Sequence, residues 1–374
     1  MASYVIIQSQ KNDLDNRYAG DSLGRGAFVL TEGNHMHKVF PGLLFSTLLA
    51  TSLATGCGGL GGDVEKSPPT IVRASSSKTN ENRDKGTIGV SVLTLTNPFF
   101  KVIADSITDE AKRNGYDVIV TSGEFDVARQ HNQVKDFIVK KVSAVILCPC
   151  DSRSIGPAIQ EANKAGIPVF TADIACLAPG AKVVSHIATN NYGGGKQAAE
   201  ALIEAVGEAG GKLLILDFKQ AESCLQRVKG FKDVIEAHNK TRSTGKLTIV
   251  AELPGDGKKD QGYKCAEDAL QSHPDLSAIF AINDPSALGA RAALEKAGKA
   301  AQIKIIAFDG QPEGKQAIKD GKIYADPVQY PDRIGKMTVT SILRYFAGED
   351  VPAEQLIPTG LYRQADGAKD PELK

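Results

Sequence analysis

Polar side chains follow the ends of several apolar runs, and their types suit the recognition of hydroxyl groups. Asp173, Asn283 and Asp309 each come directly after a short apolar run. Carboxylates and carboxamides can pair in two ways with neighbouring hydroxyls, and aromatic faces can cover apolar C–H faces. Aromatic residues are only 6% of the chain and Trp is absent, so Phe99 and Phe100 beside another such run are informative. These residues indicate recognition chemistry without a reaction.

Motifs of the common enzyme classes are missing from residue 87 onward, where strands and helices are predicted. This part of the sequence has no G-x-S-x-G, no H-E-x-x-H and no G-x-G-x-x-G after a predicted strand. Gly195-Lys196 lacks the upstream glycine of a phosphate-binding loop and is followed by Gln197 rather than Ser or Thr. The six His residues show no zinc-ligand spacing with Cys or acidic residues. We therefore expect no enzyme, no catalytic residues, no cofactor and no metal.

The stretch 87–100 is the element around which the rest is organised. A short apolar run predicts a buried strand, and apolar residues at helical spacing follow from Phe100 onward. Asn97 suits a helix N-cap and Pro98 the next position, where no N–H is needed. Phe99 and Phe100 then lie on the first helical turn, beside the carboxyl end of the strand, where open α/β sheets bind their ligands.

From residue 87 onward, predicted strands and helices alternate, which implies a mainly parallel sheet with helices on both faces. The polar, glycine-rich segment 188–195 interrupts this rhythm and is interpreted as a hinge. We predict an α/β fold with two doubly wound parallel-sheet lobes joined by a hinge, with a ligand cleft between them. The predicted lobes are residues 87–190 plus 330–357 (N-terminal) and residues 191–329 plus 358–374 (C-terminal).

The segment before residue 87 reads as export and anchoring sequence. Residues 1–35 are interpreted as a mis-assigned or disordered extension before a true start at Met36. Residues 36–57 have the basic front edge and short apolar run of a secretory signal. Their end, Leu-Ala-Thr-Gly-Cys, resembles the lipobox of bacterial lipoproteins, which makes Cys57 the lipidation site; the alternative is a plain signal with an incidental cysteine. Residues 58–86 are interpreted as a flexible tether.

Length and charge narrow the class further. A chain of 374 residues with 42% hydrophobic residues favours two domains over one. Lys plus Arg and Asp plus Glu both number 44, so no net field attracts nucleic acid. We expect no nucleic-acid partner.

Several motifs in one order give a more specific resemblance. Together they look like a ribose-type periplasmic sugar-binding protein, the type I solute-binding fold that serves ABC sugar importers. The resemblance extends from about Thr87 to Arg363. The motifs are Asn-Pro-Phe-Phe (97–100), Val-Ser-His-Ile-Ala (184–188), Ala-Ile-Asn-Asp (281–284), Gly-Ala (289–290), Phe-Asp-Gly (308–310) and Pro-Asp (331–332).

The resemblance implies the ligand-binding residues. Asn97 and Asp173 would bind ring hydroxyls from the first lobe, with Phe99 and Phe100 as walls. Polar contacts from the second lobe and the hinge would come from Arg227, Asn283, Asp309 and Gln329.

Three positions depart from the family's pattern. Ile174 stands where Arg is common, Cys148 where Asn is frequent and Gly257 where a cleft Phe often stands. Losing an Arg and an Asn removes hydrogen bonds of about 1.5–3 and about 1 kcal/mol respectively. The sugar is therefore expected to differ from ribose in its usual pose and to be bulkier, less hydroxylated or seated differently.

Each of these residues has a structural alternative. Asn283 and Asp309 could cap the helices that begin near Pro285 and Pro312, and Arg227 could be a solvated helix residue. Phe99 and Phe100 could both belong to the core. Asp173 could simply form a turn.

The cysteines after Cys57 are odd in number, so at least one thiol stays free or pairs between chains. Cys150 and Cys176 follow adjacent strands, which makes a disulfide between them geometrically plausible. Free buried thiols are the default expectation. The remaining cysteines are Cys148, Cys224 and Cys265.

The resemblance implies a membrane-anchored, exported and monomeric sugar receptor that delivers its ligand to an ABC permease. One alternative is an exported receptor that presents a ligand to a chemoreceptor or histidine kinase. Another is the ligand-binding core of a transcription regulator, which requires an N-terminal DNA-binding helix pair where this sequence has a signal and a tether.

Overall fold

The structure, a computed structural model, describes residues 85–374. The predicted extension (1–35), the predicted signal peptide with Cys57 (36–57) and all but the last two residues of the predicted tether (58–86) lie outside the described residues. Two sheets, A and B, organise residues 85–374.

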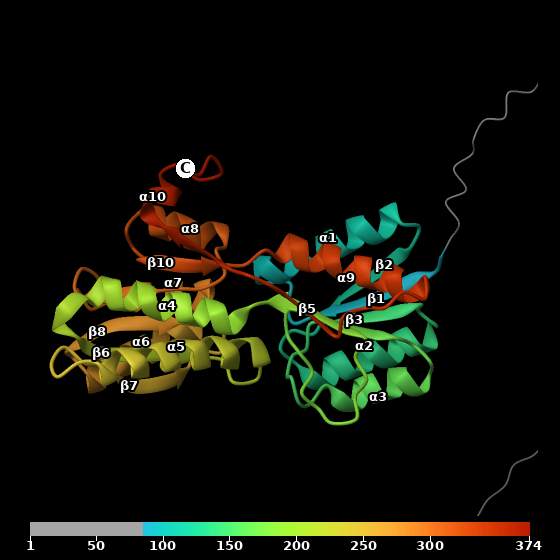
Figure 1. The fold of residues 1–374 in the computed structure, drawn as a ribbon, viewed down its shortest axis with the longest axis horizontal. Coiled ribbons are helices and arrows are strands. Elements are labelled where there is room, and N and C mark those ends of the chain that lie inside the picture. Colours follow the sequence, from blue (N-terminus) through green and yellow to red (C-terminus); the bar gives the residue numbers. More distant parts are fainter. Residues whose placement is uncertain (1–84) are drawn as a thin grey trace, which may run out of the picture. The chain divides into compact units, whose positions relative to one another are not determined.

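Sheet A has six strands in the order β11-β5-β4-β3-β1-β2, and all neighbouring strands pair in parallel. Strands β3 and β4 are buried at every residue, as expected for parallel strands covered on both faces. Helices α1 and α9 pack together, as do α2 and α3, and the two pairs lie on opposite sides of the sheet (Figure 1). We call this unit the N-terminal lobe. Its strands are β1 (Thr87–Val92), β2 (Asp117–Ser122), β3 (Ala144–Leu147), β4 (Val169–Ala172), β5 (Ser185–Thr189) and β11 (Glu354–Ile357). Its helices are α1 (Pro98–Arg113), α2 (Val127–Val139), α3 (Gly156–Lys164) and α9 (Pro331–Phe346).

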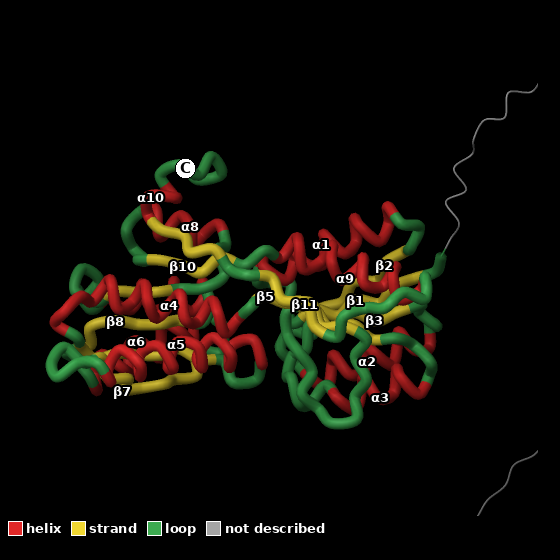
Figure 2. Tube along the Cα trace, in the orientation of Figure 1, coloured by secondary structure: helices red, strands yellow, loops and turns green. Residues whose placement is uncertain are grey.

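Sheet B also has six strands, in the order β12-β10-β9-β8-β6-β7. Only β12 is antiparallel to its neighbour among these described strands. Helix α4 packs with α5, and α6 packs with α7. We call this unit the C-terminal lobe, and Figure 2 shows its alternation of strands and helices. Its strands are β6 (Gly211–Asp217), β7 (Leu247–Pro254), β8 (Leu276–Ala281), β9 (Lys304–Ile306), β10 (Ala325–Val328) and β12 (Gly360–Arg363). Its helices are α4 (Asn191–Val206), the 3-10 turn η1 (Gly207–Ala209), α5 (Glu222–Lys240), α6 (Lys259–Ser272), α7 (Asp284–Lys296), α8 (Pro312–Lys319) and α10 (Gln364–Gly367).

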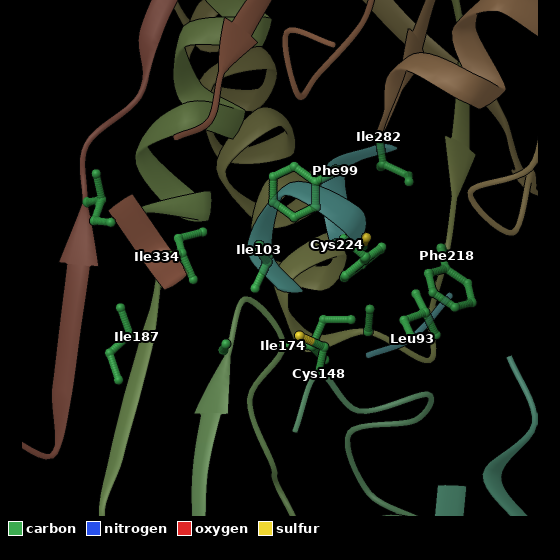
Figure 3. Packing of buried hydrophobic residues seen from close by; sticks show 14 of the residues in the cluster. Leu93, Phe99, Ile103, Cys148, Ile174, Ile187, Phe218, Cys224, Ile282 and Ile334 are labelled. Atoms are coloured by element: carbon green, nitrogen blue, oxygen red, sulfur yellow. The ribbon is translucent and has the colours of Figure 1, made fainter. Parts of the chain in front are cut away.

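These two sheets confirm the predicted fold class. The chain passes between the lobes three times, from β5 to α4, from β10 to α9 and from β11 to β12. One apolar cluster includes residues of both lobes, with Phe99 and Ile103 of α1 and Phe218 and Cys224 of the C-terminal lobe among its members (Figure 3).

The prediction that all of 188–195 forms a hinge is wrong, because α4 already begins at Asn191. The side chain of Asn190 caps this helix by accepting a hydrogen bond from the Gly193 N–H. The glycines at the start of α4 allow this helix to pack closely against α5. A Cβ on Gly195 would lie only 2.0 Å from the carbonyl oxygen of Arg227 on α5. Gly230 on α5 is equally constrained, since its Cβ would lie 2.2 Å from the Tyr192 carbonyl oxygen.

Candidate functional site

The carboxyl ends of the strands from both lobes surround one cavity. All eight residues predicted as ligand-binding line it, together with residues that the sequence-based prediction did not include. The eight are Asn97, Phe99, Phe100, Asp173, Arg227, Asn283, Asp309 and Gln329.

The start of α1 forms one wall of the cavity. Asn97 is the N-cap of α1, as predicted, and its Oδ1 accepts a hydrogen bond from the Phe99 N–H at 3.0 Å. Pro98 occupies the first helical position. Phe99 and Phe100 are both buried, and their rings meet edge to face at 5.3 Å. Both aromatics therefore belong to the core and also line the cavity.

Asp173 lies just after β4 in a left-handed backbone conformation, with φ 65°. Its side chain is buried, and its Oδ1 has no hydrogen-bond partner in the described part of the chain. Burial raises the pKa of Asp173 to about 7, although the Arg227 charge lowers it. Asp173 is therefore a turn residue that also holds an unpaired acceptor at the cavity.

Arg227 is the centre of a polar network in the C-terminal lobe. Its Nη1 donates to Asp309 Oδ1 at 3.2 Å and to the Ile282 carbonyl at 2.7 Å, and its Nε donates to Asn191 Oδ1 at 2.8 Å. The guanidinium also lies 4.0 Å from the centre of the Phe308 ring. Because Arg227 is buried in an ion pair with Asp309, its alternative interpretation as a solvated helix residue is wrong.

Gln329 completes this network after β10. Its Nε2 donates to Asp309 Oδ1 at 2.6 Å, while its Oε1 is buried without a partner among residues 85–374. Asp309 Oδ1 thus accepts from both Arg227 and Gln329, and its Oδ2 has no partner among the same residues. Burial raises the pKa of Asp309 to about 6 despite the opposing charge of Arg227.

Asn283 does cap a helix, which was one of its two interpretations. Its Oδ1 accepts from the Ser286 N–H of α7 at 3.1 Å, and its Nδ2 donates to the Gly257 carbonyl at 3.1 Å. One amide N–H remains for a ligand. Asp309 does not cap α8, whose N-cap residue is Gln311.

Two further buried carboxyl groups support the loop after Asp309. Asp284 Oδ2 accepts from the Gln311 N–H at 2.6 Å, and Asp326 Oδ2 accepts from the Gly310 N–H at 3.1 Å. Burial raises the pKa of both carboxyl groups, to about 7 for Asp326 and well above its ordinary value for Asp284. Each keeps a buried Oδ1 without a hydrogen-bond partner among residues 85–374, and the charge of each neighbouring carboxylate adds to the rise in pKa. This pair holds the loop and was not predicted from sequence.

Sequence reasoning also missed two aromatic residues of the cavity wall. Phe125 follows β2 and Phe218 follows β6, and both line the cavity. Phe218 directly follows β6 and Phe125 lies three residues after the end of β2, and these positions were a usable signal because aromatic residues are rare in this chain. Ile174, Gly257 and Cys224 also line the cavity.

The five described cysteines are free, so the disulfide considered between Cys150 and Cys176 is not formed. All are buried except Cys176, which is half-buried. Within residues 85–374 no group of His, Cys, Asp and Glu could hold a metal ion. In the same range no helix is long and apolar enough to span a bilayer.

Comparison with known proteins identifies the class. The periplasmic binding protein domain matches residues 88–350. The chain is 36% identical to the ribose import binding protein of Salmonella typhimurium over 285 residues, which is 76% of this chain and 93% of that protein. It is 34% identical to the ribose import binding protein of Bacillus subtilis over 298 residues, 79% of this chain and 92% of the relative.

Solved structures agree with the fold. An ABC transporter periplasmic solute-binding protein from Actinobacillus succinogenes with bound D-allose superposes with a TM-score of 0.69 and 26% identity, covering 76% of this chain and 100% of the other. Two sheet-based lobes around a cavity of polar strand ends define a solute-binding protein. The chain belongs to the periplasmic binding protein family, and its relatives are solute-binding proteins of transporters rather than enzymes.

Proposed function

We propose that this chain is the sugar-binding component of an ABC-type importer and holds a monosaccharide in the cavity between its lobes. The observation that carries this proposal is a pair of buried acceptors without partners, Asp173 Oδ1 and Gln329 Oε1, at one cavity. A buried polar group without a hydrogen bond costs about 1–3 kcal/mol. Sugar hydroxyls are donors that would satisfy both acceptors.

Donors at the same cavity complement these acceptors. Arg227 Nη2 and Asn97 Nδ2 have no hydrogen-bond partner among residues 85–374, and each can donate to a hydroxyl oxygen. Phe99 and Phe100 supply apolar surface for C–H groups. The names of the relatives, which are ribose import binding proteins, support a sugar as the ligand class.

The wider setting is part of the same proposal. The protein is exported, anchored through a lipid on Cys57, monomeric, and passes its sugar to a membrane permease. Its lobe boundaries are those predicted from sequence. Ile174, Cys148 and Gly257 favour a sugar other than ribose.

The experiment that tests the function is a thermal-shift screen of the full chain against pentoses, hexoses, deoxysugars and polyols, including D-ribose, D-allose and myo-inositol. A ligand at about a hundred times its dissociation constant stabilises the folded state by about 2.7 kcal/mol. A clear shift with one sugar is the expected result. If no compound shifts the unfolding temperature, the proposal of a sugar ligand is rejected. The alternative of an exported receptor that presents a non-sugar ligand to a sensory partner is then favoured.

The site is tested separately with Asp309→Asn. The substitution keeps an acceptor at the position of Oδ1 and replaces the unpartnered Oδ2 with a donor. Loss of a charge-assisted hydrogen bond predicts an affinity for the panel sugar that is about 10- to 100-fold weaker by calorimetry. The variant should also unfold at a lower temperature, because buried Arg227 loses its counter-charge. Undiminished affinity in a cooperatively folding variant would reject this site.

A further inference from the structure

Two adjoining cavities share part of their lining. The inner one, which holds the predicted ligand-binding residues, has a volume of about 30 Å³, and the outer one has about 700 Å³. The residues common to both linings are Asn97, Phe125 and Gly257. These three residues form a neck between the inner and the outer cavity. Gly257 contributes no side chain, so a bulky group at the neck must come from elsewhere.

Phe125 is held at the neck by the N-terminal lobe. Its N–H donates to the Leu93 carbonyl at 3.2 Å, and the N–H of Gly123 donates to the Val92 carbonyl at 2.8 Å. Phe125 and Glu124 both have left-handed backbones, with φ 60° and 53°. A bulky residue rarely adopts this conformation, which persists only where surrounding contacts impose it.

The side chain of Glu124 supplies part of that anchoring. Its carboxylate accepts hydrogen bonds from the hydroxyls of Ser122 and Thr94. The direction of the Phe125 ring is therefore set by the lobe from which it projects.

The ring itself contacts the other lobe. It meets the Phe218 ring edge to face, with ring centres 6.1 Å apart. The ammonium of Lys258 lies 4.4 Å from the centre of the Phe125 ring. Phe218 follows β6 and Lys258 precedes α6, so both contacts cross the cleft and are lost when the lobes separate.

We propose that Phe125 is a gate residue that closes the sugar site by inserting between Phe218 and Lys258 of the opposite lobe. Its ring retains the sugar in the inner cavity and slows its release. That the retained ligand is a sugar rests on the proposed function. The contacts of Phe125 with Phe218 and Lys258 do not depend on a bound ligand.

The cysteines of the chain offer a test that needs no sugar. Cys224 lines the inner cavity and is 5% exposed, so a thiol reagent reaches it only after the neck opens. Cys150 lies beneath the Phe125 loop, because a Cβ on Gly123 would be 2.4 Å from its Sγ. Cys150 therefore reports unfolding of the loop itself. Cys265 is buried outside the inner cavity and serves as a reference.

The experiment compares N-ethylmaleimide labelling of the full chain and of Phe125→Ala, read at each cysteine by peptide mass spectrometry. An aromatic pair and a cation–π contact each account for a factor of about 2 to 10, so Cys224 should react roughly 5- to 50-fold faster in the variant. Cys150 and Cys265 should keep their rates. An unchanged rate at Cys224 would overturn the gate, and so would equal acceleration of Cys150 and Cys224.

Two matched variants sharpen the result. Phe346→Ala removes an exposed phenylalanine of the same lobe away from the neck and should change none of the rates. Lys258→Met should accelerate Cys224 less than Phe125→Ala does, and it should add nothing in the Phe125→Ala background. Full additivity of the two changes would contradict a shared contact.

The two proposals fail separately. If no sugar shifts the unfolding temperature but Cys224 is labelled faster in Phe125→Ala, the proposed sugar-binding function is rejected and the gate is retained. A panel sugar that binds, with unchanged Cys224 labelling and an unchanged dissociation rate in Phe125→Ala, would remove the gate and leave the function.

Discussion

Asp173 combines three features that rarely meet in one residue. It is buried, its backbone is left-handed, and one of its carboxylate oxygens lacks a partner among the described residues. Burial disfavours the charged carboxylate and raises its pKa to about 7. A hydroxyl that donates to Oδ1 would favour the charged form and lower this pKa. Sugar binding should therefore release a proton.

The sign of the pH dependence of binding is set by this shift. Because the bound form has the lower pKa, affinity for the panel sugar should rise from about pH 5 to about pH 8, by about tenfold or more. Calorimetry in buffers of different ionisation enthalpy measures both the affinity and the released proton. Asp173→Asn should flatten most of the slope, and Asp309, with its own raised pKa, accounts for the remainder. Affinity that falls with rising pH would mean that the carboxyl group donates to the ligand.

Ile174 is predicted to exclude D-ribose in its usual pose. It is 1% exposed and lines the cavity beside Asp173. Ile174→Arg would place a guanidinium with several N–H donors at the cavity, beside the carboxylate of Asp173. The affinity for D-ribose should therefore increase by about tenfold. Ile174→Met, which keeps the volume and adds no charge, is the control in the same titration. No gain with Arg would place the ligand elsewhere.

At the scale of elements, the start of α1 has two tasks that can be separated. Asn97 caps the helix through Oδ1, while its Nδ2 has no partner among residues 85–374. Asn97→Asp keeps the cap and loses the donors, so unfolding free energy should stay near that of the wild type while sugar affinity falls by about 3- to 10-fold.

Asn97→Ala is the companion variant. It loses the cap and the donors together, so it should unfold about 0.5–2 kcal/mol more easily and also bind weakly. Chemical denaturation and calorimetry on the three proteins separate the two effects. An Asn97→Asp variant that binds like the wild type would limit Asn97 to its structural role.

Local patterns predicted the start of α1, where Asn97 is the N-cap and Pro98 the first helical residue, as the sequence places them. The first turns of α4 were missed because glycine favours loops by its intrinsic propensity, whereas here Gly195 permits a close helix crossing. Strands β11 and β12 were also missed. Each has four residues and pairs with β5 or β10, strands far away in sequence.

The site was largely predictable because the polar residues follow parallel strands, whose carboxyl ends converge. Asp173, Asn283 and Asp309 line the cavity for that reason. Arg227 lies on α5, and it was predicted from the family resemblance instead. The support of the loop after Asp309 by buried Asp284 and Asp326, and the cross-lobe position of Phe125, depend on tertiary contacts that no local pattern encodes.

At the scale of the whole described unit, the lobes leave little space in the inner cavity, which holds the predicted ligand-binding residues. The inner cavity of about 30 Å³ is far below the roughly 300–1,000 Å³ typical of small-molecule sites. A sugar ring can therefore enter only if the walls move apart. Contacts between the lobes then compete with opening, and they contribute to affinity by stabilising the closed arrangement.

One such contact is a helix cap supplied across the cleft. Helix α5 begins at Glu222, and its own N-cap residue, Ala221, has no side-chain acceptor. Ser152 of the N-terminal lobe fills that role, because its Oγ accepts from the Glu222 N–H at 2.9 Å. The N–H of Ser152 donates to the Gln220 carbonyl at 2.9 Å, so this residue has a second contact with the opposite lobe. Closure thereby satisfies an orphan donor of the helix that carries Arg227.

Removing this cap should favour the open arrangement. A cap is worth about 0.5–2 kcal/mol, so Ser152→Ala should weaken affinity for the panel sugar by about 2- to 30-fold and increase the radius of gyration of the free protein in small-angle scattering. The stability of each lobe should change little, because water can reach the Glu222 N–H once the lobes part. Ser154→Ala, an exposed serine two residues away, is the matched control. If the Ser152 and Ser154 variants scatter and bind alike, the cap plays no part in closure, and the other cross-cleft contacts, those of Phe125 included, must hold the lobes together.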